Sequence, residues 1–142
     1  GFGFVRYSGL KDNDAVVEGR PAVILGDTMG DLKKFYALAT VVFVGRSLAA
    51  MGGSDMMEPT GLGRCTLFGP HTFNFKQTVR ALLAGNGAIE VKDVNELYEQ
   101  TRRCLSDAAY ARRIADNGRR VIRQNQGATQ TTVDAVGRLL SQ

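Results

Sequence analysis

A glycine-rich loop after one apolar run contains residue types that can hold a phosphorylated ligand. "GRSLAAMGGSDMMEP" (45–59) follows "VVFV". Gly52 and Gly53 have no side chains, so a ligand can approach the backbone there, and the next residues open a predicted helix. Free N–H groups and the positive end of a helix dipole favour phosphate. The loop therefore predicts a phosphate site at a helix start.

Two carboxylates stand in this loop, although the formal net charge of the chain is +4. Asp55 and Glu58 share one helical face by their i, i+3 spacing, and Pro59 fits the first helical turn. A carboxylate at Glu58 can accept hydrogen bonds from the vicinal diol of a ribose. Asp55 has two interpretations, a helix cap or part of the frame around a polar ligand, and the residues alone leave both open.

A second loop of this kind, "GDTMGDL" (26–32), follows "AVIL". Gly26 and Gly30 allow a sharp turn, and Asp31 can cap the helix that begins there. In an open α/β sheet, ligands bind outside the carboxyl ends of the strands. The loop is therefore either a ligand loop or a plain strand-to-helix turn.

A third loop, "FGPHTFNF" (68–75), contains His71, the only histidine of the chain. No serine–histidine–carboxylate order and no metal-ligand spacing surrounds it, so it either braces the loop or faces the ligand. Cys65 and Cys104 form no CxxC motif, and we expect two buried free thiols in a reducing compartment. Neither a metal nor a cofactor is expected.

Strand-like and helical patterns alternate through the first two thirds of the chain, which predicts an α/β fold with a Rossmann-like parallel sheet and flanking helices. The expected strands are 2–7, 22–26, 41–45, 65–69 and 88–91, and the helical patterns between them are 31–39, 56–63 and 73–85. From about residue 93 the pattern becomes a helical tail, expected as helices 93–107, 107–125 and 127–142. Asp93 and Asp107 are predicted N-caps, and Gly127 is a predicted break.

Length and composition indicate one globular domain, since the chain has 142 residues, 44% of them hydrophobic and 23% charged. No apolar stretch is long enough for a membrane span and no signal-peptide pattern is present, so we expect the chain as given to be soluble. The sequence opens inside a strand pattern, which suggests a single domain over 1–142 that is truncated at its N-terminal side. Arginines gather late in the chain, around Tyr110, and form either a solvated face or a surface that attracts nucleic acid or anionic membranes.

Four motifs resemble a known family. "GDTMGDL", "YALATVVFVGRSL", "GGSDMMEP" and "FGPHTFNF" look like the C-terminal, donor-binding half of the 3-deoxy-D-manno-octulosonic acid (Kdo) transferases of lipopolysaccharide synthesis, over about residues 22–126. These are inverting glycosyltransferases of the GT-B architecture. They use CMP-Kdo as donor and a lipid A precursor as acceptor.

The resemblance implies a set of donor-binding residues. The family's CMP contacts fall on Met29, Gly30 and Asp31 in one loop and on Asp55, Met56, Met57 and Glu58 in the other, beside Gly52 and Gly53. Further candidates are Ser47, His71 and Asn74. Where the family usually has "GGHNPLEP", this chain has Ser54, Asp55 and Met56, and Arg46 replaces a glycine of the family's "GGS".

The resemblance also implies what the chain does not contain. The family's catalytic base is a glutamate of an N-terminal domain that also receives the acceptor, so no catalytic residue is expected here and the fragment alone is expected to be inactive. The full-length protein would work at the cytoplasmic side of the bacterial inner membrane, and nucleic acid is not an expected partner. The alternatives are a non-catalytic nucleotide- or nucleic-acid-binding module and another GT-B nucleotide-sugar enzyme.

Overall fold

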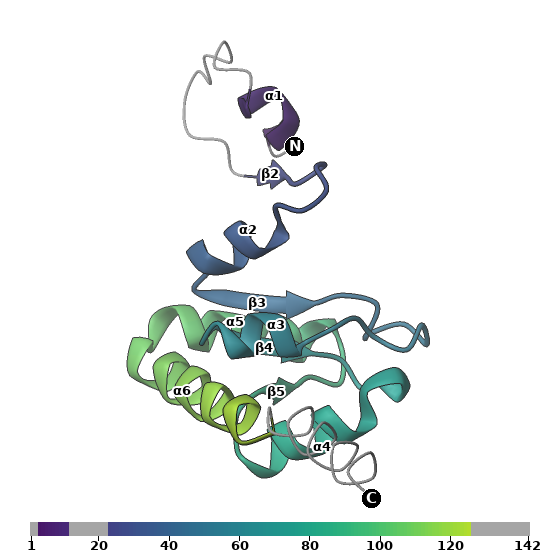
Figure 1. Ribbon diagram of the computed structural model, residues 1–142, viewed down its shortest axis with the longest axis vertical. Helices are drawn as coiled ribbons and strands as arrows, with labels where there is room; N and C mark the ends of the chain where they lie inside the picture. The colour runs from purple at the N-terminus through teal and green to yellow at the C-terminus, as the bar shows by residue number, and fades with distance from the viewer. Residues whose placement is uncertain (1–2, 12–22, 126–142) are drawn as a thin grey trace, which may run out of the picture. The chain divides into compact units, whose positions relative to one another are not determined.

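The computed structural model describes residues 3–11 and 23–125, and it divides the chain into two compact units, 1–35 and 36–142. Each unit has its own parallel sheet (Figure 1). None of the helices in the described ranges is long and apolar enough to cross a membrane. The expected helix over 127–142 and the break at Gly127 lie outside the described residues.

The first unit contains a short parallel pair of strands, β1 (Phe4–Arg6) and β2 (Val23–Leu25), with helix α1 (Tyr7–Lys11) after β1. The sequence did not predict α1. Ser8 in this helix donates from its backbone N and its Oγ to the Asp27 carboxylate, at 2.9 and 2.8 Å. These two bonds, with the backbone bond contributing most, lower the pKa of Asp27 and connect α1 to the loop after β2.

The second unit is built on a three-stranded parallel sheet in the order β3-β4-β5, with β3 at Val41–Val44, β4 at Cys65–Phe68 and β5 at Ile89–Glu90. β4 lies in the middle, and all four of its residues are buried. A parallel strand covered on both faces reads as a continuous apolar run, which is why "CTLF" shows no alternation. The expected strands are confirmed, each one shorter than its predicted range.

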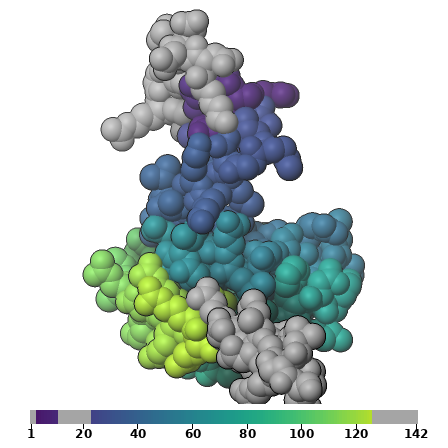
Figure 2. All heavy atoms as spheres, in the orientation of Figure 1, coloured from purple at the N-terminus to yellow at the C-terminus, as the bar shows by residue number. Residues whose placement is uncertain are grey.

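Each face of β4 carries one core. On one face, Phe68 packs with residues of β3, with Met56 and with α4 (Lys76–Ala84). On the other face, Cys65 and Leu67 pack with residues of α5 (Val94–Ser106) and α6 (Ala108–Asn125). Helix α3 (Met57–Gly61) contacts α6 and lies beside it at the molecular surface (Figure 2). Helix α2 (Leu32–Leu38) precedes β3, and the 3₁₀ turn η1 (Phe73–Phe75) precedes α4.

The caps of the two long helices are confirmed. Asp93 accepts a hydrogen bond from the Glu96 backbone N at 2.9 Å, and Asp107 accepts one from the Tyr110 backbone N at 2.9 Å. Each carboxylate satisfies an N–H group that has no partner inside its own helix. The helical segment from about residue 93 is therefore confirmed as far as residue 125.

Candidate functional site

Ser47 joins the loop after β3 to the loop after β4. Its side chain is fully buried, and its Oγ donates to the Val44 carbonyl at 2.6 Å and accepts from the Gly69 backbone N at 2.8 Å. The His71 backbone N donates to the Ser47 carbonyl at 2.9 Å. Because these bonds occupy the Ser47 hydroxyl, its structural role is to align the two loops at the carboxyl end of the sheet.

The alignment brings predicted site residues together. Gly52 and Gly53 both have positive φ, at 85° and 77°, and such a turn favours glycine. The side chains of Phe73 and Asn74 lie directly over Gly52, and the His71 carbonyl lies beside Gly53. Two sequence-distant motifs therefore form one surface, in which the side chains of His71 and Asn74 are exposed.

Asp55 lies one residue before Met56, the N-cap of α3, and its carboxylate engages the N–H of the first helical residue. Its Oδ1 accepts a hydrogen bond from the Met57 backbone N at 2.7 Å, and its side chain is exposed. The helix is only five residues long. The expected phosphate site at this helix start thus has one of its N–H groups engaged by the chain's own carboxylate.

Glu58 is exposed in the first turn of α3, and Tyr36 lies near it. Burial raises the pKa of Tyr36, and the charges of Glu58 and Asp55 raise it further. Both carboxylates therefore lie near Tyr36, but the predicted shared helical face is wrong because Asp55 precedes α3. Sequence analysis missed Tyr36 as a site residue, although it opens the motif "YALATVVFVGRSL" just before β3.

The two methionines of this loop have different environments. Met56 is fully buried in the core, so it can reach a ligand only through its backbone. Met57 remains 42% exposed, and its side chain can contact a ligand directly. Helical geometry places neighbouring residues on different faces, which explains why adjacent methionines differ.

The loop "GDTMGDL" belongs to the first unit. Met29 is 98% exposed and Gly30 has a φ of 84°, whereas Asp31 is only 4% exposed. The Asp31 carboxylate accepts a hydrogen bond from Thr28 Oγ1 at 2.7 Å and forms an ion pair with Lys34 at 2.8 Å. Asp31 thus fixes the turn into α2, while Met29 and Gly30 form its exposed tip.

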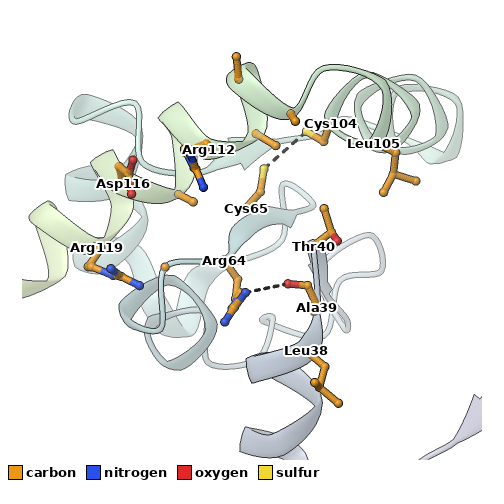
Figure 3. Close-up of a pocket in the computed structure, with 15 residues that line it drawn as sticks. Leu38, Ala39, Thr40, Arg64, Cys65, Cys104, Leu105, Arg112, Asp116 and Arg119 are labelled. Atoms are coloured by element: carbon orange, nitrogen blue, oxygen red, sulfur yellow. Dashed lines mark hydrogen bonds between the residues drawn. The ribbon is translucent and has the colours of Figure 1, made fainter.

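A separate cavity of about 780 Å³ lies at the opposite, amino-terminal edge of the sheet, where β3 and β4 begin (Figure 3). Arg64, Arg112 and Arg119 lie around it, and Arg64 donates to the Ala39 carbonyl at 3.3 Å. None of the residues predicted from sequence to hold the ligand lines this cavity. In open α/β sheets the ligand edge is the carboxyl one, so the candidate site remains the loops described above.

The two cysteines border this cavity as free, buried thiols, with their Sγ atoms 3.5 Å apart. This confirms the prediction of buried free thiols. Burial raises the pKa of Cys65 from 9.0 to about 12, and the thiol of Cys104 beside it adds to this shift.

The raised pKa predicts a loss of stability in alkali. Below pH 9 the Cys65 thiol is protonated in both the folded and the unfolded chain, so its contribution to folding is fully present. As pH rises from 9 towards 12, only the unfolded chain loses this proton, and the free energy of unfolding falls by up to about 1.4 kcal/mol per pH unit. Urea unfolding at several pH values measures this slope. In the variant Cys65→Ala, the free energy of unfolding should fall less steeply over the same pH range. A fall as steep as that of the wild type would contradict the raised pKa of Cys65.

Comparisons of the sequence with known proteins point to one family. No protein-family model matches the sequence. The chain is 34% identical over 114 residues to a 3-deoxy-D-manno-octulosonic acid transferase of Bordetella pertussis, covering 80% of this chain and 27% of that protein. A transferase of the same name from Haemophilus influenzae is 35% identical over 113 residues, covering 79% of this chain and 26% of that protein. The chain thus spans about a quarter of the length of these relatives.

A solved structure gives the same result for the fold. The C-terminal CMP-Kdo binding domain of WaaA from Acinetobacter baumannii superposes with a TM-score of 0.75 at 27% identity, covering 85% of this chain and 61% of that one. Within the described residues, no group of three or more histidine, cysteine, aspartate or glutamate side chains could hold a metal ion. The similarities to the two transferases and to the solved domain show that the chain belongs to the Kdo transferase family and corresponds to part of that family's C-terminal domain.

Proposed function

We propose that this chain binds CMP-Kdo as the donor-binding part of a glycosyltransferase. The observation that carries the proposal is the pair of loops aligned by Ser47, because it gathers exposed carboxylates and a glycine turn at the ligand edge of the sheet. The similarity to a solved CMP-Kdo binding domain supports the same ligand.

In this proposal Glu58 accepts hydrogen bonds from the ribose hydroxyls. Gly52 and Gly53 provide the tight turn before α3, but they are buried, and the side chains of Phe73 and Asn74 cover Gly52, so the sequence prediction that a ligand approaches the backbone there is wrong for Gly52. Met57 offers an exposed apolar contact, and Met56 contributes only its backbone. Met29, Gly30 and Asp31 form the second donor loop, with Asp31 holding the turn and the other two meeting the ligand.

The whole protein's activity is proposed from its relatives. We infer an inverting transfer of Kdo from CMP-Kdo to a lipid A precursor, with the acceptor held by an N-terminal domain and the enzyme at the cytoplasmic side of the inner membrane. The 142 residues alone are expected to bind donor without turnover, since they span about a quarter of the relatives' length. The domain organisation, one donor-binding domain over 1–142, remains a prediction.

The one aromatic residue among the late arginines does not support the nucleic-acid alternative. Tyr110 is the aromatic residue among the late arginines, and a base would need its ring face for stacking. The Arg103 guanidinium lies 3.8 Å from the ring centroid and that of Arg113 lies 5.4 Å from it. The ring is therefore already packed against the chain's own cations.

Calorimetric titration of the chain with CMP and with UMP tests the proposed function. We expect binding of CMP at millimolar or better affinity and weaker binding of UMP. Equal affinities would favour another GT-B nucleotide-sugar enzyme. Salt-dependent binding to arbitrary DNA or RNA, without CMP binding, would favour the nucleic-acid module.

The variant Asp55→Asn separates the hydrogen bond to the Met57 N–H from the ligand role. An asparagine Oδ1 can still accept from the Met57 N–H, so the melting temperature should barely change. Removing a negative charge near the donor phosphate should tighten CMP binding by a few fold. One titration and one thermal unfolding experiment measure both effects. Weaker CMP binding would mean that the carboxylate itself recognises the ligand.

A further inference from the structure

Arg46 has a backbone conformation that costs free energy for any residue other than glycine. Its φ is 61°, in the left-handed region, where the Cβ atom of an L-residue is crowded. It lies two residues after the end of β3 and next to Ser47, at the carboxyl edge of the sheet. An arginine in this conformation needs a compensating interaction.

The Arg46 side chain supplies no such interaction within the described part of the chain. The Arg46 side chain is exposed, and its guanidinium makes no hydrogen bond, ion pair or ring contact with the residues at 3–11 and 23–125. Only its backbone is engaged, since the Arg46 carbonyl accepts from the Gly53 N–H at 3.0 Å. This bond holds the Arg46 backbone, whereas the guanidinium has no partner among these residues.

The backbone bond places Arg46 in the candidate site. It closes the loop from 46 to 53, so the Cα of Arg46 lies next to the glycine turn that precedes Asp55 and Glu58. Two exposed carboxylates by themselves would repel an anionic donor. A guanidinium is the side chain best suited to bind a phosphate or carboxylate oxyanion.

We propose that Arg46 is a donor-recognition residue whose guanidinium binds an oxyanion of the nucleotide sugar, either the phosphate or the sugar carboxylate. The proposal rests on the proposed function. It explains both the strained backbone and the unpartnered cation by one contact.

Three variants separate charge from strain. Arg46→Gln removes the charge and keeps the strain, Arg46→Lys keeps both, and Arg46→Gly removes both. Arg80→Gln, an exposed arginine of α4, is the control for net charge. Arg46→Gly should raise the melting temperature by roughly 2 to 6 °C, because glycine adopts positive φ without strain.

Titrations with cytidine, CMP and CMP-Kdo then identify the oxyanion. If the phosphate is bound, Arg46→Gln and Arg46→Gly weaken CMP and CMP-Kdo by roughly tenfold or more and leave cytidine unchanged. If the carboxylate is bound, only CMP-Kdo weakens. In either case Arg46→Lys retains part of the affinity, and Arg80→Gln behaves as wild type.

The proposal is overturned if the wild type binds CMP-Kdo and both uncharged variants bind it within twofold as well. An unchanged melting temperature for Arg46→Gly would remove the strain argument and overturn it too. If the wild type binds neither CMP nor CMP-Kdo, the proposed function fails, and this inference fails with it.

Discussion

Replacing Gly69 by alanine is expected to destabilise the fold by about 2 to 3 kcal/mol, the usual cost of overpacking a site that cannot relax. A Cβ atom at Gly69 would meet the Ser47 carbonyl oxygen, with the Ser47 carbonyl carbon at 2.6 Å and the Leu48 backbone N at 2.7 Å. All these atoms belong to the backbone, so no side-chain rotation relieves the contact. Thermal unfolding measures the loss, expected as a fall of roughly 10 °C in melting temperature.

Gly45→Ala provides the matched control for this variant. Gly45 lies in the loop after β3, and a Cβ atom there would have nothing within 4 Å. The free energy of unfolding of the Gly45→Ala variant should differ from that of the wild type by no more than about 0.5 kcal/mol. CMP binding should weaken in Gly69→Ala only, because separating the loops also breaks the bond from the Gly69 N–H to Ser47 Oγ. Equal stability of the two variants would mean that the loops do not approach as closely as described.

The strands were predictable because each is a short β-branched or apolar run, and four of the five expected runs end at or near a glycine. "VVFV" and "CTLF" carry this signal, and both form the sheet of the second unit. The caps at Asp93 and Asp107 were predictable for a similar reason, since each acidic residue precedes a long amphipathic helix. Local chemistry determines these features, so local sequence is sufficient to find them.

Features that depend on contacts between distant residues could not be read from the sequence. Helix α1 is only five residues long, too short for a periodic pattern, and Ser8 within it bonds to Asp27, far along the chain. The hydroxyl of Ser47 is a candidate ligand contact in the sequence, but in the structure the Gly69 backbone N occupies it. The position of Tyr36 beside two carboxylates likewise follows from packing.

The role of Asp55 could not be decided from the sequence either. Residue type allowed both a cap and a ligand contact, and the structure places Asp55 one residue before the N-cap, with its carboxylate accepting a 2.7 Å bond from the Met57 N–H. A ligand contact by its second oxygen is a separate question, which titration of the Asp55→Asn variant addresses. The donor-site residues therefore stay a prediction, while the family and the fold are confirmed by the comparisons.

Truncating Glu58 to alanine should weaken CMP binding by about 1.5 to 3 kcal/mol, the range for a hydrogen bond to a charged group, which is roughly 10- to 150-fold in the dissociation constant. Glu58 is exposed and its carboxylate makes no hydrogen bond or ion pair within the described residues, so the variant should fold with nearly unchanged stability. Calorimetry with CMP measures the loss, and Glu99→Ala on α5 controls for the removal of a surface carboxylate.

A second ligand assigns this loss to the ribose diol. Deoxycytidine monophosphate lacks the 2′-hydroxyl, so it should bind the wild type more weakly than CMP does, and Glu58→Ala should cost it less. The difference between the two losses is the coupling between the carboxylate and the hydroxyl, measured as in a double-mutant cycle. If both ligands lose the same affinity, Glu58 acts through its charge on the whole site. If neither loses any, the donor does not contact this face of α3, and the exposed carboxylate needs another explanation.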